Sequence, residues 1–166
     1  MDLYVVRHAV ARKRNRDRWP DDAERPLTPK GEERFRRVAR GILRLVPEVG
    51  AVLSSPFVRA WQTAEILEQA GWSAPVSCEE LEPDYPSHKV LGTLARCCDG
   101  LESVAIVGHR PSLHELGSHL LTGEADSIRL QIKKGGMACV QFDGTPEAGT
   151  GSLRWLLTPG ALQAIG

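Results

Sequence analysis

The sequence predicts an α/β fold, a three-layer sandwich in which a mostly parallel central sheet carries helices on both faces. Two observations lead to this class. Short apolar segments alternate with amphipathic segments over most of the chain, and this alternation is typical of parallel sheets with crossover helices. The length of 166 residues also suits one domain whose core needs no disulfide or metal. We therefore expect a single domain over residues 1–166.

The expected strands are short and rich in apolar residues. Residues 3–6 (Leu-Tyr-Val-Val) and residues 103–107 have the uninterrupted apolar character of strands that are buried on both faces. The other strands are expected at residues 51–54, 76–78, 137–142 and 153–157. The last two flank a segment rich in Gly, Thr and Pro, which predicts a hairpin with a long loop.

Segments between these strands predict helices. Thr28 and Pro29 have the N-cap and first-turn identities of a helix start, and apolar residues then recur three and four positions apart up to Val46. Pro47 and Gly50 end this helix. Further helices are expected near residues 56–70, 87–98, 111–121 and 159–165.

Two helix starts carry a specific expectation. Ser55 and Pro56 predict that the second helix begins directly after the strand before it. Ser112, with Glu115 three residues later, predicts a capping box at the start of the fourth helix. Residues 9–27, by contrast, show no periodic pattern and are expected to be irregular.

The charges are balanced overall but unevenly placed. Lys plus Arg and Asp plus Glu each number 21, so the formal net charge is zero. This balance gives no signature of nucleic-acid or anionic-membrane binding. One stretch contains Arg12, Lys13, Arg14, Arg16 and Arg18, followed by Asp21, Asp22 and Glu24. Two interpretations stay open: a solvated loop that neutralises itself, and a basic rim that attracts an anionic substrate or partner.

The cysteines and the chain start bear on the cellular environment. Cys78, Cys97, Cys98 and Cys139 form no CxxC pair and no zinc-ligand spacing. The chain opens directly into a strand without a basic-then-apolar leader, and it contains no apolar run near 18 residues. We expect a reduced, cytoplasmic, monomeric protein with no metal, no cofactor, and no nucleic-acid or membrane partner.

Polar side chains follow or flank three of the expected strands. Arg7 and His8 come directly after residues 3–6, Arg59 lies in the first turn of the second helix, and His109 follows residues 103–107. If these strands are parallel, the side chains meet at one edge of the sheet, beside helix N-termini that favour anions. The sequence therefore predicts a phosphate pocket that contains a nucleophile.

The residue types suit phosphoryl transfer. Arginine binds phosphate oxygens bidentately and keeps its charge, so Arg7 and Arg59 can hold the phosphoryl group. Nearby arginines disfavour the cationic form of His8, which leaves a neutral imidazole with a lone pair for covalent catalysis. His109 can donate a hydrogen bond to the phosphoryl oxygens as their charge develops. This chemistry requires no metal.

These motifs resemble the histidine phosphatase superfamily, also called phosphoglycerate mutase-like. The resemblance rests on Arg7-His8, Ser54-Ser55-Pro56, Arg59-Ala60, Gln62-Thr63-Ala64 and Gly108-His109. The short length and the segments at residues 25–31, 81–83 and 155–159 are similar to the small SixA-type phosphohistidine phosphatases within it. The resemblance covers nearly the whole chain, and it implies a phosphoglycerate mutase-like fold and a hydrolase.

The resemblance also implies roles for individual residues. His8 would be the phosphorylated nucleophile, and Arg7, Arg59 and His109 would complete the phosphate pocket. Arg25 is a candidate for the pocket rim because it belongs to a matching motif.

Two features depart from the pattern of the larger family. Ala9 stands where the family usually has Gly, so its methyl group could crowd the pocket or shift the turn. The larger family also supplies an acidic residue that protonates the leaving group. Glu82 and Asp84 are candidates by position, with exposed loop acids as the alternative interpretation. A protonated phosphoimidazole leaves as neutral imidazole and depends less on such an acid than an alkoxide does.

The leading functional hypothesis is a phosphatase that acts through phosphorylated His8 on a phosphohistidine-bearing protein. One alternative is a small-molecule phosphomonoesterase, which would need a working acid. Another is an inactive phosphate-sensing module. The remaining histidines, His88, His114 and His119, are expected to have surface or packing roles.

Overall fold

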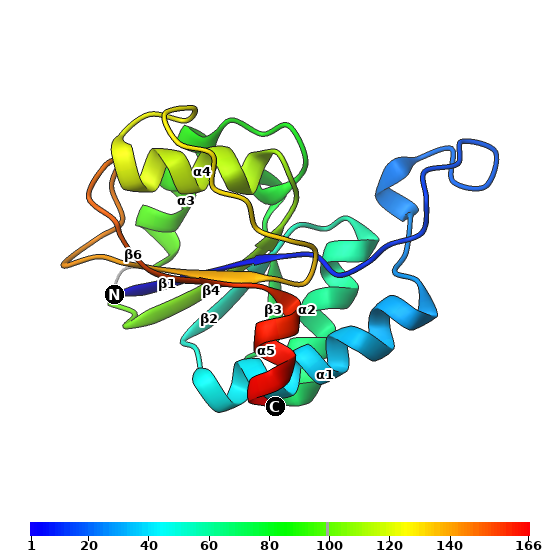
Figure 1. The fold of residues 1–166 in the computed structure, drawn as a ribbon. Coiled ribbons are helices and arrows are strands. Elements are labelled where there is room, and N and C mark those ends of the chain that lie inside the picture. The colour runs from blue at the N-terminus through cyan, green and yellow to red at the C-terminus, as the bar shows by residue number, and fades with distance from the viewer. Residues whose placement is uncertain (99) are drawn as a thin grey trace.

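Strand β1 (Asp2–Arg7) lies inside the central sheet. In the computed structural model, which describes residues 1–98 and 100–166, β1 pairs in parallel with β4 (Ser103–Gly108) and antiparallel with β5 (Met137–Gln141). The sheet is completed by β2 (Ala51–Ser54), β3 (Pro75–Ser77) and β6 (Ser152–Leu157), in the order β3-β2-β4-β1-β5-β6. The predicted α/β class with a mostly parallel sheet is confirmed, and β5 and β6 form the predicted hairpin (Figure 1).

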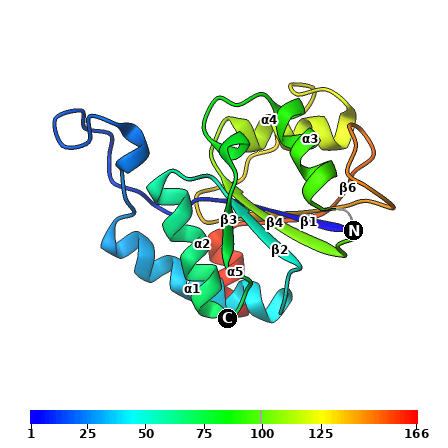
Figure 2. The same ribbon diagram turned by 180° about the vertical axis from the view of Figure 1, so that it is seen from behind.

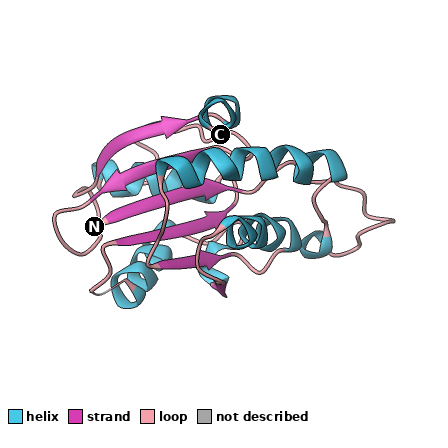
Figure 3. Cartoon of the chain, turned by 90° about the horizontal axis from the view of Figure 1, so that it is seen from below, coloured by secondary structure: helices cyan, strands magenta, loops and turns pink. Residues whose placement is uncertain are grey.

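Helices cover both faces of the sheet, as the two opposite views show (Figures 1 and 2). One face carries α1 (Pro29–Leu45), α2 (Val58–Ala70) and α5 (Pro159–Ile165), and Figure 3 views the molecule from this side. The opposite face carries α3 (Ser87–Cys97) and α4 (Ser112–Thr122). The predicted three-layer sandwich is therefore present.

The central strands contribute to two separate cores because their side chains alternate. Tyr4 and Val6 of β1 face the core beneath α1, α2 and α5, whereas Leu3 and Val5 face the core beneath α3 and α4. All four side chains are buried. A strand covered on both faces needs apolar residues at every position, which explains its uninterrupted apolar run.

The register of the parallel strands brings their carboxyl ends to one edge. Arg7 at the end of β1 is paired with Gly108 at the end of β4, and Ser54 at the end of β2 is paired with Val107. The segments that follow these three strands therefore start side by side. This edge is where an open α/β sheet forms its functional crevice.

Helix α1 begins as the sequence predicts, and two other starts differ. Thr28 caps α1 by accepting the backbone N–H of Gly31 at 2.9 Å. Helix α2 begins at Val58, later than predicted, because Ser55 instead accepts the N–H of Phe57 at 3.3 Å in a turn before the helix.

The capping box predicted for α4 is wrong. The N-cap residue of α4 is Pro111, and it makes no side-chain capping bond. The hydroxyl of Ser112 accepts the backbone N–H of Asp84 at 3.0 Å, so a tertiary contact engages it. Short 3-10 helices lie at Asp22–Glu24 and Glu79–Leu81. Among the described residues, no helix combines the length and the apolar character needed to cross a membrane.

Candidate active site

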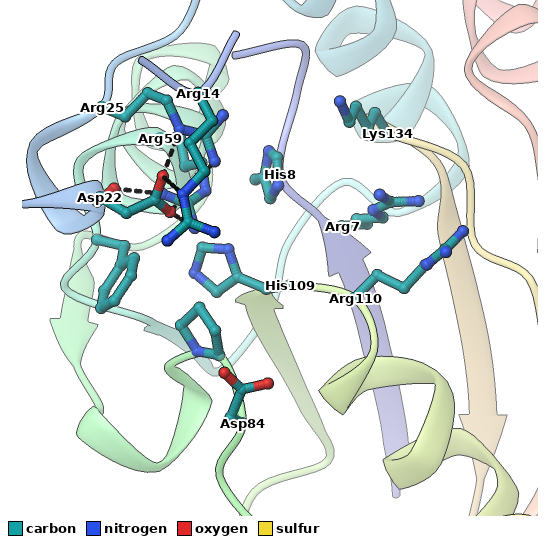
Figure 4. A pocket seen from close by; sticks show the side chains of 12 residues that line it. Arg7, His8, Arg14, Asp22, Arg25, Arg59, Asp84, His109, Arg110 and Lys134 are labelled. Carbon is teal, nitrogen blue, oxygen red and sulfur yellow. Dashed lines mark hydrogen bonds and ion pairs between the residues drawn. The ribbon is translucent and has the colours of Figure 1, made fainter. Parts of the chain in front are cut away.

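A cavity of about 490 Å³ opens at the carboxyl edge of the sheet. It brings together the four residues that the sequence predicted for the phosphate pocket, Arg7, His8, Arg59 and His109. Figure 4 shows the two histidines between two groups of cations. Arg14, Arg25 and Arg59 lie on one side, and Arg7, Arg110 and Lys134 lie on the other. The site is thus built to receive an anion.

His8 is buried and held by its own backbone neighbour. Its Nδ1 lies 2.7 Å from the carbonyl oxygen of Ala9. A carbonyl oxygen can only accept, so Nδ1 carries the proton and the lone pair of the neutral ring is on Nε2. Burial, together with the charges of Arg59, Arg7 and Lys134, lowers the pKa of His8 to about 3, and the bond to Ala9 opposes the shift. This direction agrees with the predicted neutral imidazole, and burial rather than the neighbouring arginines is its main cause.

His109 faces His8, and the two ring centres are 5.1 Å apart. Burial, followed by the neighbouring His8 and Arg59, lowers the pKa of His109 to about 2. Its Nε2 lies 3.0 Å from the hydroxyl oxygen of Ser55, and its buried Nδ1 has no partner among residues 1–98 and 100–166. The Ser55 oxygen already accepts the N–H of Phe57. If the Ser55 hydroxyl donates to Nε2, the proton of His109 lies on Nδ1 and is free for an anion.

Arg59 is a buried cation whose guanidinium is only partly paired. Its Nη1 donates to the carbonyl oxygen of Asp22 at 2.8 Å, and its Nη2 lies 3.1 Å from the carboxylate of Asp22. The guanidinium also lies 4.9 Å from the ring centre of Phe57. Burial and the charge of Arg25 lower the pKa of Arg59 to about 10, so the group stays charged at neutral pH. Its Nε has no partner within the described part of the chain.

Arg7 is likewise held by one hydrogen bond and likewise has a buried N–H without a partner in the described chain. Its Nη1 donates to the carbonyl oxygen of Ile132 at 3.0 Å, while its buried Nε lacks a partner in the residues that the structure describes. Burial and the charge of Arg110 lower the pKa of Arg7. Buried N–H groups are nearly always hydrogen-bonded. Unpaired donors on Arg7 and Arg59 beside one cavity, with His109 Nδ1 as a third when Ser55 donates to Nε2, therefore point to an oxyanion as the missing partner.

Asp22 lines the cavity and was not predicted to belong to the site. Its carboxylate accepts a bond from Arg25 Nε at 2.9 Å in addition to its contact with Arg59. Burial alone would raise the pKa of Asp22, but the bonds from Arg25 and the charge of Arg59 outweigh it and lower the pKa. Arg25 lines the cavity as predicted, but it holds Asp22 and the backbone of Arg12. The sequence could have suggested the Asp22–Arg25 pair, because residues three apart in a helical turn lie side by side.

Arg14, which belongs to the basic stretch considered as a possible rim, lines the cavity, and Phe57, Arg110 and Lys134 line it without having been predicted. Arg110 follows His109 directly, so the sequence could have suggested it. Lys134 comes from the segment before β5, which has no periodic pattern from which its course could be predicted. Burial and the charges of Arg7 and Arg25 lower the pKa of Lys134.

The two candidate acids lie in different surroundings. Asp84 lines the cavity next to Pro83, and Figure 4 shows it beyond His109. Its backbone is in the left-handed region with a φ of 68°, and its N–H is held by Ser112. Glu82 is not among the lining residues; it caps the short helix at Glu79–Leu81 through its backbone. A role as general acid stays a prediction, with Asp84 the better placed of the two.

Ala9 does not crowd the cavity. It is buried in the core beneath α1 and α2, it is not among the lining residues, and its N–H donates to the hydroxyl of Thr63 at 3.0 Å. The only described non-glycine residue with a positive φ is Asp84, so Ala9 has an ordinary backbone conformation. The family glycine is therefore not needed here for backbone geometry.

Two of the remaining histidines have packing roles, as expected. His114 accepts the backbone N–H of Ile132 at 3.2 Å, and His119 is bonded to Ser87 at 2.9 Å. His88 is exposed on α3. Among the described residues, no group of three or more His, Cys, Asp or Glu side chains is placed to bind a metal ion.

Comparison with known proteins agrees with this geometry. Residues 3–82 match the model of the histidine phosphatase superfamily, branch 1. The chain is 31% identical over 165 residues to phosphohistidine phosphatase SixA of Escherichia coli K12, covering 96% of this chain and 94% of that protein. This chain therefore belongs to the histidine phosphatase superfamily. Within that superfamily it is a SixA-type member.

Two further matches support the assignment. The structure of the protein histidine phosphatase SixA complexed with tungstate superimposes with a TM-score of 0.84 and 28% identity, covering 98% of this chain and 99% of that one. An uncharacterized protein of Picosynechococcus is 34% identical over 139 residues, which is 82% of each chain. Membership of the superfamily supports phosphatase activity.

Proposed function

We propose that this protein hydrolyses phosphohistidine on a protein substrate through a phosphorylated His8 intermediate. The observation that carries the proposal is the bond between His8 Nδ1 and the carbonyl oxygen of Ala9 at 2.7 Å. It assigns the lone pair of a neutral, buried imidazole to Nε2, which is the nitrogen that would attack phosphorus. The nearly full-length match to a phosphohistidine phosphatase supports the choice of substrate, and it supports a single histidine phosphatase domain over residues 1–166.

In the first step the non-bridging oxygens of the phosphoryl group would be held by the unpaired donors. Arg7 Nε and Arg59 Nε are buried N–H groups without a partner in the described chain, and His109 Nδ1 is a third when Ser55 donates to Nε2. His8 Nε2 would form a bond to phosphorus as the bond between phosphorus and the substrate imidazole breaks. The substrate nitrogen takes the electron pair, and the ring leaves neutral when its other nitrogen carries a proton.

In the second step water would attack the phosphorus of phospho-His8. The bond between phosphorus and Nε2 breaks, its electron pair returns to the imidazole, and inorganic phosphate leaves. Water is the only co-reactant. The same donors that hold the phosphoryl oxygens in the first step hold them in the second, so no rearrangement of the cavity is needed.

The surroundings of the cavity suit a phosphate presented by a protein. Between β3 and β4 the described chain contains only a short 3-10 helix and α3, and α3 packs against α4 on one face of the sheet. Asp84 at the cavity wall is itself exposed. A histidine on a protein surface could therefore approach His8 without a lid having to open.

Trapping the intermediate tests this proposal. The protein is incubated with radiolabelled phosphoramidate, quenched in base and assayed for protein-bound label. We expect a label that is stable in base and labile in acid, and that is absent from His8→Asn and His8→Ala. Wild-type protein that binds inorganic phosphate but acquires no label would instead indicate the phosphate-sensing module.

A small-molecule phosphomonoesterase is the second candidate, because Asp84 lines the cavity where a general acid could act. An alkoxide leaving group needs a proton, whereas a protonated imidazole does not. Asp84→Asn should therefore slow hydrolysis of a phosphoester by about 100-fold if this candidate is correct. Equal rates of phosphoester hydrolysis by Asp84→Asn and wild type would exclude Asp84 as its acid.

A further inference from the structure

A basic arm, defined here as residues 12–19, leaves the cavity wall and projects from the body of the molecule (Figure 1, blue). Its root is fixed. Ala11 and Leu27 form an isolated antiparallel bridge, and the N–H of Arg12 donates to Pro26 at 2.9 Å. The chain therefore leaves and re-enters the body at one place, which holds the arm beside the cavity.

The tip of the arm has a defined conformation. The side-chain oxygen of Asn15 accepts the backbone N–H groups of Asp17 and Arg18 at 2.9 and 3.0 Å. The N–H of Trp19 donates to the carbonyl oxygen of Asn15 at 2.9 Å, and the guanidinium of Arg18 lies 5.1 Å from the ring centre of Trp19. Much of the conformational entropy that a flexible loop would lose on binding is therefore already lost.

Within the described chain, Arg14 is the one cation of the arm that forms an ion pair with an acid following it, at 3.7 Å to Asp22. Asp21 accepts the N–H of Ala23 at 2.8 Å, and Asp22 is engaged by Arg25 and Arg59 at the cavity. Asp21 and Asp22 thus make their main contacts where the arm joins the body of the molecule. In the described chain no carboxylate lies within 4.0 Å of the charged groups of three exposed residues, Lys13, Arg16 and Arg18. Asp17 is the one acid within the arm. The acids after the arm therefore leave most of its charge unpaired, which favours the basic rim over the self-neutralising loop.

The charge of the arm is continuous with that of the cavity. Arg14 belongs to the arm and also lines the cavity, opposite the group formed by Arg7, Arg110 and Lys134. A phosphoryl group bound by Arg7 and Arg59 would leave the cations of the arm tip unused, because they do not line the cavity. In a chain of zero net charge, such a surface is a local concentration of positive charge.

We propose that the basic arm docks an acidic surface of the protein that carries the phosphohistidine. This rests on the proposed function and extends it to the class of partner. A substrate protein inserts its phosphohistidine into the cavity, and the surface around that residue meets the arm. Complementary charge there raises the association rate and orients the encounter, whereas a small phosphoester is too short to reach the arm.

The test compares two charge-reversed variants. The arm variant is Lys13→Glu with Arg16→Glu, which leaves the cavity residue Arg14 unchanged. The matched control is Arg40→Glu with Arg154→Glu, two exposed arginines on α1 and β6. The probes are two phosphohistidine peptides of equal length, with aspartates or lysines around the phosphohistidine, and phosphoramidate as the small substrate. Binding of the unphosphorylated acidic peptide is followed by fluorescence anisotropy at low salt.

We expect the arm variant to raise KM for the acidic peptide about tenfold and to weaken its binding by a similar factor. Hydrolysis of phosphoramidate should stay unchanged, and the control variant should match wild type throughout. The difference should shrink in 0.5 M salt, where exposed charges are screened at about 4 Å. The lysine peptide should show no loss with the arm variant.

Different results would contradict the docking proposal and the proposed function. Unchanged binding and KM of the acidic peptide in the arm variant would overturn the docking, and so would an equal loss with phosphoramidate, which would reveal an effect on the cavity. Wild-type protein that hydrolyses neither peptide but binds the acidic one through the arm would overturn the proposed substrate and leave the docking surface in place.

Discussion

Ser55 and His109 are joined by a hydrogen bond of 3.0 Å between the serine hydroxyl and Nε2 of the imidazole. Both side chains are buried, and the serine oxygen also accepts the N–H of Phe57. When the hydroxyl donates to Nε2, the ring proton of His109 lies on Nδ1. Through this contact a residue that does not line the cavity would determine which nitrogen of His109 carries the proton.

Ser55→Ala should disturb the tautomer of His109. Without the hydroxyl, the proton of the ring is free to move to Nε2, and the donor facing the cavity is lost in part. We expect kcat to fall about tenfold with little change in KM, because the bond matters most as charge develops on the phosphoryl oxygens. Nitrogen-15 NMR of the imidazole gives a direct check: a wild-type His109 protonated on Nε2 would contradict the assignment.

The two buried histidines should make stability fall in acid. Their pKa values in the folded protein, about 3 for His8 and about 2 for His109, lie below the ordinary 6.5. Between these values the unfolded chain binds more protons, so the free energy of unfolding decreases as the pH falls below 6.5, by up to about 1.4 kcal/mol per pH unit for each histidine. Above pH 6.5 this contribution is complete and constant.

Urea denaturation of wild type and His8→Asn at pH 7.5, 6.5 and 5.5 measures that slope. The variant lacks one of the two histidines, so its stability should depend less steeply on pH below 6.5. Background titration of the groups away from the cavity is common to both proteins and cancels in the difference. Parallel curves would show that His8 is protonated as easily in the folded protein as in the unfolded chain.

Asp22→Ala should destabilise the fold by about 2 kcal/mol, because it leaves the buried Arg59 without its counter-charge. The neighbouring Asp21→Ala removes only the cap of a short 3-10 helix and should lose about 0.5 kcal/mol. The stabilities of the two variants are compared through their urea denaturation midpoints, provided that the dependence of the unfolding free energy on urea (m) is the same in both. A loss for Asp22→Ala no larger than that for Asp21→Ala would mean that the ion pair contributes nothing to stability.

Two helical glycines should respond in opposite ways to alanine. A Cβ at Gly41 would overlap the carbonyl oxygen of Leu162, where α1 crosses α5, whereas a Cβ at Gly92 meets only the mobile end of Arg96 at 3.5 Å. Gly41→Ala should therefore lose about 2 kcal/mol, and Gly92→Ala should gain about 0.5 kcal/mol from helix propensity. Thermal unfolding should show a lower midpoint temperature than wild type for Gly41→Ala and a higher one for Gly92→Ala.

Ala9→Gly should leave catalysis intact and weaken the fold. The methyl group lies in the core and not at the cavity, so kcat/KM should stay within about threefold of wild type. The loss of a buried methyl group and the freer backbone should cost about 1 kcal/mol of stability. A rise in kcat/KM of tenfold would instead show that Ala9 limits the turn that carries His8.

The sequence predicted the strand ends well because the pattern there is local. The apolar runs of β1 and β4 stop at Arg7 and Gly108, and the parallel register then places His8 beside His109. Helix periodicity likewise predicted α1. These features depend on residues close together in the chain, which is the scale that periodicity and capping rules describe.

The remaining features depend on partners far apart in the chain. Ser112 fits a capping box, but Asp84 uses its hydroxyl, 28 residues away. Asp22 binds Arg59 across 37 residues, and no short motif signals that pairing. Lys134 reaches the cavity from a segment without periodicity. Rules that consider one helix or strand at a time cannot predict that a distant residue will bind a given side chain.

The central position of β1 has a consequence for biosynthesis. Strand β1, which ends just before His8, is translated before both of its neighbours, because β4 and β5 begin at Ser103 and Met137. Until those strands leave the ribosome, both edges of β1 lack hydrogen-bond partners and its apolar side chains lack a core. Such distant pairing is slow to form. His8 therefore gains its fixed imidazole only when most of the polypeptide has been made, so an incomplete chain exposes an unpaired apolar strand without the assembled cavity.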